Sequence, residues 1–556
     1  MHTSDKKLIF LVFIFFFLIN VISSGGHLDW WDGIEAFLVT ESMVLKQTAK
    51  LDPAVPSVKN LGFNVNYTVY ANTALQKGNT SNPSSVILEP VYTVRSLLLS
   101  AAAVPFYYAA NIFSVAPVVT VGLFVNSLFI SLTAVVIFCI CIEVQRSNKI
   151  AFAMSLIYCV CSFVWPYNAT FWVQPLQGLL LVSSAYFILL TSHRNHSFLC
   201  NYVLERKRRS ILFAGLAGLS LGLSVFAHPT SLILIPAFLV YSFFSVMRHQ
   251  KVDFILLLVI LSTVLFFAGL TNYVRYHSFT EFGYGYFSTL AAHNGWKGLI
   301  GLLVSPGAGL IFYFPLAILL PLGAKYMHKD NKSLLYLCLY VIVANWIYIG
   351  TLSFGFEPAS WSGGVAWGPR YLLPVLPFML IILGSIFQNM KKRIFLKSIV
   401  LGLCLVGFYV NLSGVLIWFQ YGLMYGWTFE RLASFPNYMD TMTWSPFYSP
   451  VVLHAKALMS NYVSTIHPEQ YVNTSWHWTG YGNAPCKYDF YVYCNLGTIP
   501  FVVTIVSIAV IGILIAVRIG IFPFSYMKWL SNLLHTRGTP GALIPTNRHR
   551  RGLHFR

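Results

Sequence analysis

The apolar stretch from Leu8 to Ile22, LIFLVFIFFFLINVI, decides the fold class of this chain. Its only polar residue is Asn20, and Lys6 and Lys7 precede it. No clear small-residue cleavage site follows it, so the stretch predicts a retained membrane-spanning helix and not a cleaved signal peptide. The two lysines place its first end on the cytoplasmic side.

The rest of the chain repeats this pattern. Of its 556 residues, 57% are hydrophobic and only 10% are charged, whereas soluble domains carry about 25% charged residues. We therefore expect an all-α polytopic membrane protein with about twelve transmembrane helices. The expected spans lie near residues 8–22, 115–142, 150–166, 174–191, 211–227, 230–247, 253–270, 297–322, 334–352, 370–388, 395–418 and 499–520.

The net charge of +19 reflects membrane topology and not a nucleic-acid partner. Lys and Arg gather in short loops between the apolar stretches, as they do in cytoplasmic loops. With the first end inside, every basic cluster falls inside and both ends of the chain are cytoplasmic. The clusters are Arg146/Lys149, Arg194 to Arg209, Arg248/Lys251, Lys325 to Lys332, Lys391 to Arg393, and Arg518 to Arg556.

The apolar stretch from Ser96 to Phe113 would reverse this topology if it crossed the bilayer. We interpret it as an interfacial or re-entrant helix, kinked near Pro105, that lies next to a cavity. Four units follow. They are a transmembrane module over residues 1–418 with an outer loop at 23–114, an extracytoplasmic segment at 419–498, a last span at 499–521, and a basic cytoplasmic tail at 522–556.

Nine cysteines are present, of which seven lie in or near apolar stretches. Cys486 and Cys494 both lie in the outer segment, so we expect a disulfide between them. No Cys/His cluster has the spacing of a zinc site, and no metal ligands are predicted from such a cluster.

An acidic segment, GGHLDWWDGIE, occupies residues 25–35 directly after the first apolar stretch. If the chain is helical from Gly33 onward, Asp29, Asp32 and Glu35 recur every three residues on one face, close to the bilayer surface. A carboxylate there is placed to act as a general base on a substrate that the membrane delivers. Two other interpretations stay open: a solvated loop face, and ligands for a divalent cation.

Three further stretches accompany this acidic motif. They are His228-Pro229-Thr230, Ser305 to Leu310, and Trp361 to Gly364 continuing through Gly368 to Tyr371. In order and topology, residues 1–420 resemble the GT-C superfamily of integral-membrane glycosyltransferases, in the branch of protein O-mannosyltransferases and aminoarabinose transferases. Many members carry an adjacent Asp-Glu pair, whereas here Gly33 follows Asp32.

The resemblance implies a sugar donor carried on a polyprenyl phosphate and a base that deprotonates the acceptor. Asp32 matches the position of that base best, with Asp29 and Glu35 as alternatives. Cations must hold the phosphate of the donor, and Arg370 is the first candidate because its planar fork suits bidentate contact. The remaining expected residues are Arg95, Lys297 and His228 at the phosphate and Trp31, Trp361 and Tyr371 along the substrate.

The resemblance implies an inverting glycosyltransferase of the plasma membrane, active on the extracytoplasmic face. Its partners would be the lipid-linked donor, membrane lipids, and an acceptor protein, glycan or lipid. No cofactor is identified from the sequence, and a divalent cation at the acidic segment stays open. A transporter or lipid flippase is the alternative, but the spans contain almost no ionisable residues at their centres. A non-catalytic sugar-binding or assembly subunit is the second alternative.

Overall fold

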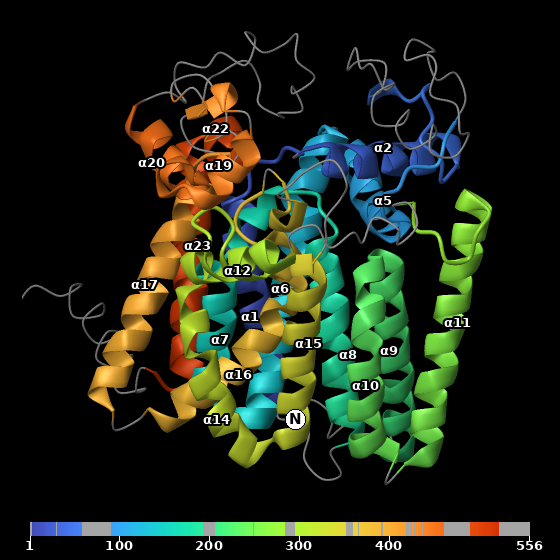
Figure 1. Ribbon diagram of the computed structural model, residues 1–556, viewed down its shortest axis with the longest axis vertical. Helices are drawn as coiled ribbons and strands as arrows, with labels where there is room; N and C mark the ends of the chain where they lie inside the picture. The colour runs from blue at the N-terminus through green and yellow to red at the C-terminus, as the bar shows by residue number, and fades with distance from the viewer. Residues whose placement is uncertain are drawn as a thin grey trace, which may run out of the picture.

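The computed structural model describes a helical protein in which long apolar helices form a bundle and shorter helices cover one end of it (Figure 1). No strand occurs among the residues that it describes, apart from one isolated bridge between Leu51 and Val91. The described residues are 3–28, 30–57, 90–192, 206–247, 250–283, 295–351, 360–364, 366–390, 393–418, 422, 425–426, 430, 432–435, 437–460 and 490–521.

Nine helices within these ranges are long and apolar enough to cross a membrane. One of them joins three helical segments end to end, and another joins two. The last of them is also the last helix of the described chain. They are α6 (Pro117–Gln145), α8 (Gln174–Ser192), α9 (Arg206–Ala227), η2 with α10 and η3 (Pro229–Leu234, Ile235–Ser242, Phe243–Met247), α11 (Lys251–Tyr276), α15 (Lys332–Thr351), η7 with α16 (Arg370–Val375, Leu376–Asn389), α17 (Ile394–Leu416) and α23 (Thr498–Arg518).

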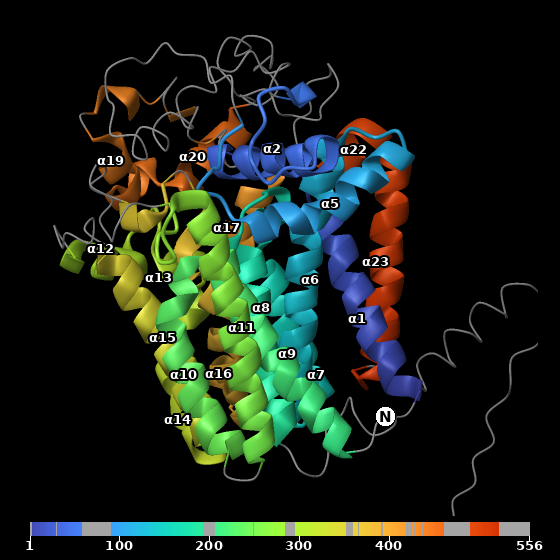
Figure 2. The ribbon, with the colours of Figure 1, turned by 90° about the vertical axis from the view of Figure 1, so that its right-hand side faces the viewer.

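The multi-helix membrane class predicted from the sequence agrees with this bundle, and the count of twelve spans stays a prediction. Helix α1 (Thr3–Ile22) covers the first expected span and packs against α6 and α23 along the bundle (Figure 2). Helix α7 (Asn148–Val160) is shorter than the expected span at 150–166. It gives way to the 3₁₀ helix η1 (Trp165–Ala169), which begins just before Pro166.

The expected span at 297–322 is not a single helix. Helix α12 (Gly295–Val304) ends where Ser305-Pro306-Gly307 begins, and three short segments follow it: α13 (Leu310–Tyr313), η5 (Pro315–Leu319) and α14 (Leu320–Asp330). Proline lacks the amide that continues a helix. Gly307 also lies so close to the neighbouring backbone that a Cβ there would be 2.3 Å from the carbonyl oxygen of Met442.

The short helices gather at one end of the bundle, which we call the capped end. Helix α2 (Trp30–Lys46) and α5 (Leu97–Ile112) lie across this end and pack against each other (Figures 1 and 2). The stretch from Ser96 to Phe113 therefore forms a short helix at the end of the bundle, and its interfacial or re-entrant position in the bilayer stays a prediction. The other members at or near this end are η6 (Ser360–Ser362), η8 (Leu432–Ser434), α19 (Tyr438–Trp444), η9 (Pro446–Tyr448), α20 (Pro450–Met459) and α22 (Tyr491–Leu496).

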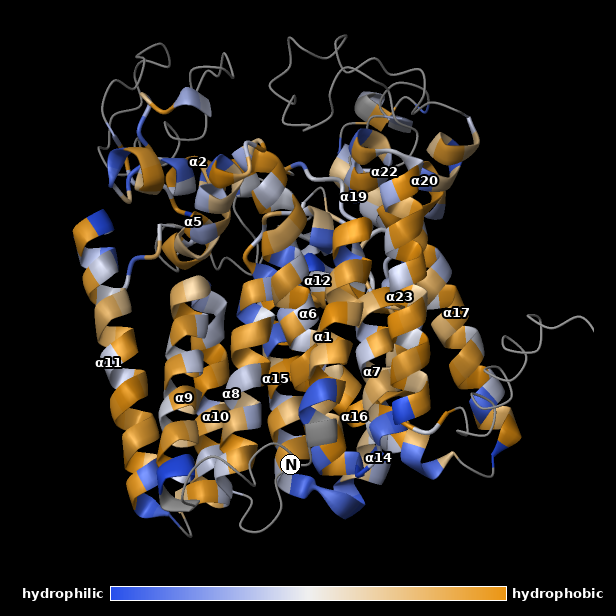
Figure 3. Cartoon of the chain, turned by 180° about the vertical axis from the view of Figure 1, so that it is seen from behind, coloured by the Kyte–Doolittle hydropathy of each residue, from blue (hydrophilic) through white to orange (hydrophobic). Residues whose placement is uncertain are grey.

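The opposite end of the bundle is hydrophilic, whereas the helices between the two ends are mostly apolar (Figure 3). The first residues of α9 and α11 are Arg206 and Lys251, and the C-cap of α6 is Arg146. The N-terminus lies at this same end (Figure 1). The basic helix ends are thus separated from the capped end by the length of the apolar bundle, which is the arrangement that the positive-inside pattern predicts.

Candidate functional site

The turn between α1 and α2 places the acidic motif over the bundle. Residues 23–28 are buried, and Gly26 has a φ of +67°, in the left-handed region that glycine adopts without strain. Ser24 Oγ donates to the carbonyl oxygen of Gly122 in α6 at 3.2 Å, and Asn168 Nδ2 donates to the carbonyl oxygen of Asn20 at 2.7 Å. These contacts fix where α2 begins, so that Asp32 lies in its first turn.

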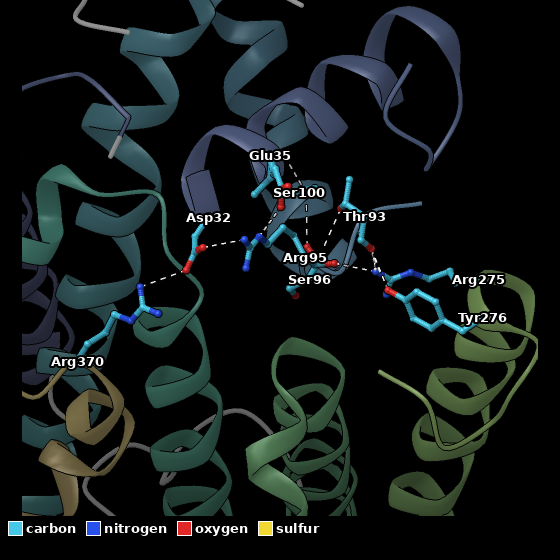
Figure 4. A network of polar contacts seen from close by, with 10 residues as sticks. Asp32, Glu35, Thr93, Arg95, Ser96, Ser100, Arg275, Tyr276 and Arg370 are labelled. Carbon is cyan, nitrogen blue, oxygen red and sulfur yellow. Dashed lines mark hydrogen bonds and ion pairs between the residues drawn. The ribbon is translucent and has the colours of Figure 1, made fainter. Parts of the chain in front are cut away.

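Asp32 and Glu35 share one face of α2, and both bind Arg95. Asp32 Oδ1 is 2.8 Å from the Arg95 guanidinium, and Glu35 Oε2 is 2.6 Å from Arg95 Nε. Arg95 directly precedes Ser96, whose hydroxyl caps α5 by accepting from the Leu99 amide at 3.3 Å. The i, i+3 spacing predicted from the sequence therefore brings two carboxylates to one guanidinium group (Figure 4).

Arg370 reaches the same carboxylate from the other side. Its NH1 atom is 3.1 Å from Asp32 Oδ2, and its NH2 atom donates to the Tyr371 hydroxyl at 2.9 Å. The guanidinium also lies 4.4 Å from the centre of the Trp172 ring, within cation–π distance. Gly368 has a φ of +66°, which glycine adopts without strain, and it lies in the turn before η7 begins at Arg370. A Cβ at this position would also be only 2.7 Å from the Tyr313 ring. Asp32 thus lies between two arginines (Figure 4).

His228 caps the segment that begins with Pro229. Its Nδ1 accepts from the Thr230 amide at 3.4 Å, which leaves the ring proton on Nε2 when the ring is neutral. Gln177 in α8 donates to the hydroxyls of Thr230 and Ser231 at 2.8 and 2.9 Å. His228 therefore caps η2 and also lines the cavity described next.

A cavity of about 220 Å³ lies at this point, between the capped end and the bundle. One part of its wall is charged and polar, and another part is apolar. The charged and polar residues include Asp32, Arg95, Gln174, His228, Thr230, Asn272, Arg275, Glu281 and Arg370. The apolar residues include Leu99, Phe226, Ala227, Leu232, Ile233 and Ile349.

The environment sets the charge of each titrating group. Burial raises the pKa of Asp32, but the positive charges of Arg95 and Arg370 outweigh it and hold that pKa below its usual range. Burial raises the pKa of Glu35 despite the ion pair with Arg95. Burial also lowers the pKa of His228 to about 4, so the imidazole is neutral at pH 7. The site therefore offers an ionised carboxylate, two guanidinium groups and a neutral imidazole.

Most of the expected site residues that can be placed meet at this cavity. Asp32, Arg95, His228, Arg370 and Tyr371 all line it. Glu35 is joined to it through Arg95. Asp29 lies outside the described residues, as does the side chain of Trp31.

Lys297 and Trp361 do not line the cavity. The Lys297 amine lies 2.8 Å from the Asp440 carboxylate in α19. The Trp361 ring is buried against Gly301 of α12 and lies 6.0 Å, edge to face, from the Trp444 ring. These residues pack together α12, η6 and α19, so the structure does not unite them with the carboxylates.

Arg275 and Trp172 are two of the wall residues that were not predicted from the sequence. Arg275 lies in the last turn of α11, and it has the same signal as Arg370: a positive charge at the end of an expected span where such charges are rare. Trp172 shows no comparable signal, because Trp is common at membrane interfaces for general reasons.

Cys494 is disulfide-bonded. Its expected partner, Cys486, lies outside the described residues, so their pairing stays a prediction. Within the described part of the chain, no group of three or more His, Cys, Asp or Glu residues is placed to hold a metal ion. The divalent cation considered for the acidic segment is not tested by this observation.

No family model matches the chain, and no curated protein matches it. Solved structures do resemble it at low sequence identity. ArnT from Cupriavidus metallidurans in the apo state is 12% identical, over 76% of this chain and 65% of ArnT, with a TM-score of 0.42. The archaeal oligosaccharyltransferase AglB from Archaeoglobus fulgidus, in complex with an inhibitory peptide and a dolichol-phosphate, is 12% identical, over 79% of this chain and 59% of AglB, with a TM-score of 0.45.

Proposed function

We propose that this chain is a GT-C glycosyltransferase that moves a sugar from a polyprenyl phosphate to an acceptor hydroxyl at the capped end. Asp32 acts as the general base, and the configuration at the anomeric carbon is inverted. One observation carries the proposal: an ionised carboxylate lies between two guanidinium groups, 2.8 and 3.1 Å away, on the wall of a cavity whose other wall is apolar. The activity, its substrates and the extracytoplasmic location are all part of this proposal.

Arg370 is the residue best suited to the donor phosphate. It is 9% exposed, and its Nε is buried without a hydrogen-bond partner in the described structure. Gln174 Oε1, another buried atom of the cavity wall, also lacks a partner there. Unpaired buried polar atoms are costly, so both favour a polar ligand. A guanidinium can bind phosphate through two parallel N–H groups, which supports this role for Arg370.

The apolar wall suits the lipid of the donor. Leu232 and Ile233, from η2, line the cavity, and Leu232 is also 36% exposed on the molecular surface. An apolar path from the surface to the charged wall would let an isoprenoid chain stay in lipid while its phosphate reaches Arg370. The donor would thus enter from the bilayer and present its sugar beside Asp32.

The proposed reaction transfers one proton and exchanges one C–O bond for another. Asp32 takes the proton of the acceptor hydroxyl, whose oxygen bonds to the anomeric carbon as the bond from that carbon to the phosphate oxygen breaks. The leaving polyprenyl phosphate gains negative charge, which Arg370 and Arg95 stabilise, and neutral His228 adds a hydrogen bond. Binding of the phosphate also draws Arg370 away from Asp32, which raises the pKa of the base and favours proton uptake.

The test measures turnover of polyprenyl-phosphate sugars by purified protein in lipid nanodiscs. The measured signal is the release of polyprenyl phosphate. Wild type should turn over at least one donor when an acceptor is present, and Asp32→Asn should not. Asp440→Asn is the matched control, since it removes a carboxylate of similar exposure (30% against 26%) from an ion pair of the same 2.8 Å length outside the cavity. Phosphate binding without turnover of any donor would instead favour the alternative function, a non-catalytic sugar-binding or assembly subunit.

A further inference from the structure

The outer end of α11 holds the loop that carries Arg95. Arg275 NH2 donates to the carbonyl oxygen of Thr93 and, at 3.0 Å, to that of Arg95 itself. The Tyr276 hydroxyl donates to the same Thr93 carbonyl at 2.9 Å (Figure 4). Two neighbouring residues of one helix therefore bind the backbone on both sides of Val94.

This loop lies between the bridge at Val91 and the first residue of α5, Leu97. Thr93 to Arg95 precede the first residue of α5, so their carbonyl groups receive no helical hydrogen bonds from it. The Arg95 amide is 3.4 Å from the Thr93 hydroxyl, which is a weak local contact. The contacts from α11 thus help to place the Arg95 backbone.

Helix α11 is firmly placed on one side although most of its surface is exposed. It packs on α9 at two glycines, where a Cβ on Gly218 would be 2.4 Å from the Leu257 carbonyl oxygen and one on Gly222 would be 2.6 Å from Val264. Arg275 is 8% exposed, in contrast to Tyr273 and Val274, its neighbours on the same turn, which are 48% and 55% exposed. Its guanidinium also lies 4.7 Å from the centre of the Tyr276 ring. The side chain is therefore held on the inner face of the helix.

We infer that Arg275 is a positioning residue: by binding the Thr93 and Arg95 carbonyls, it sets the place from which the Arg95 guanidinium reaches Asp32 and Glu35. The position of the Arg95 guanidinium is closely limited, because it contacts the Asp32 carboxylate at 2.8 Å and the Glu35 carboxylate at 2.6 Å at the same time. Displacing the loop by about 1 Å would break at least one of these contacts. This inference rests on the proposed function for its effect on turnover, but not for the loop contacts.

The test combines kinetics with hydrogen exchange on the full-length protein in nanodiscs. Arg275→Gln should lower kcat/KM about tenfold, the loss expected for charge-assisted hydrogen bonds, and Tyr276→Phe about threefold. Arg275→Lys should recover part of the loss. Tyr273→Phe, an exposed tyrosine on the same turn, and Arg393→Gln, whose arginine donates to the Tyr326 hydroxyl at 2.7 Å, are the controls and should leave kcat/KM unchanged.

A double-mutant cycle separates positioning from general loss of structure. If Arg275 acts through Arg95, adding Arg275→Gln to Arg95→Gln should cause no further loss of kcat/KM. Multiplying losses would overturn the inference. Peptides that cover residues 93–100 should also exchange amide hydrogens faster in Arg275→Gln than in wild type, and unchanged exchange would overturn it as well. Absence of turnover and of binding to a C55 polyprenyl phosphate in wild type would refute the proposed function instead, and the exchange measurement would then decide about Arg275.

Discussion

Replacing Asp32 with Asn should slow the sugar transfer and at the same time tighten binding of the donor phosphate. Asp32 belongs to an ion-pair network of four charged groups. These are two carboxylates, Asp32 and Glu35, and two guanidinium groups, Arg95 and Arg370. Their formal charge is 2 − 2 = 0 when both carboxylates are ionised, and it becomes +1 in Asp32→Asn. The same change that removes the base therefore makes the site more attractive to an anion.

The size of each effect follows from the geometry. Loss of a positioned general base costs ~10²–10⁴-fold in kcat. One negative charge ~6 Å from a phosphate, at an effective dielectric constant of ~20, contributes about 3 kcal/mol of repulsion at most. Because the Asp32 side chain is 26% exposed, solvent screening reduces this to about 1 kcal/mol, or roughly fivefold tighter binding. Release of Arg370 from its ion pair acts in the same direction.

The assay is a donor titration with single-turnover kinetics, which separates donor affinity from the rate of transfer. Asp440→Asn, the variant of matched exposure outside the cavity, should change neither value. Full turnover in Asp32→Asn would remove Asp32 as the base. A fall in donor affinity together with the rate would refute the electrostatic argument, because it would mean that Asp32 helps to hold the donor.

Three other outcomes follow from the structure. Arg370→Lys, which keeps the charge but loses the planar fork, should raise the donor Kd less than Arg370→Ala does; a wild-type Kd for Arg370→Lys in a donor titration would contradict bidentate binding. Because burial raises the pKa of Glu35, its contribution to stability is fully present below its usual pKa and is lost as the pH rises through the raised value. The Tm of wild type minus that of Glu35→Gln should therefore rise between pH 7 and pH 5, and a falling difference would show that the Arg95 ion pair dominates. Non-reducing peptide mapping should recover Cys486 and Cys494 in one disulfide-linked peptide, and recovery of Cys494 with Cys200 would refute that pairing.

Local signals account for much of what could be predicted at the site. The spacing of Asp32 and Glu35 is helical, so both residues share a face of α2 wherever the helix lies. Arg370 stands at the end of an expected span where a cation opposes the usual charge distribution. Arg275 has that same signal, and only its contacts with the Thr93 and Arg95 carbonyls give it a different task.

The amino-acid sequence by itself determined the class of the protein, because an apolar stretch long enough to cross a bilayer has few other stable environments. It also determined which end of each span carries the basic residues. Only the tertiary structure decided which cations of the capped end belong together. Lys297 and Arg95 look alike in the sequence, yet the break after Val304 leaves Lys297 beside Asp440, while the crossing of α2 and α5 brings Arg95 to Asp32. The physical reason is that an ion pair forms within about 4 Å, and which helices approach so closely depends on side-chain packing between segments far apart in the chain.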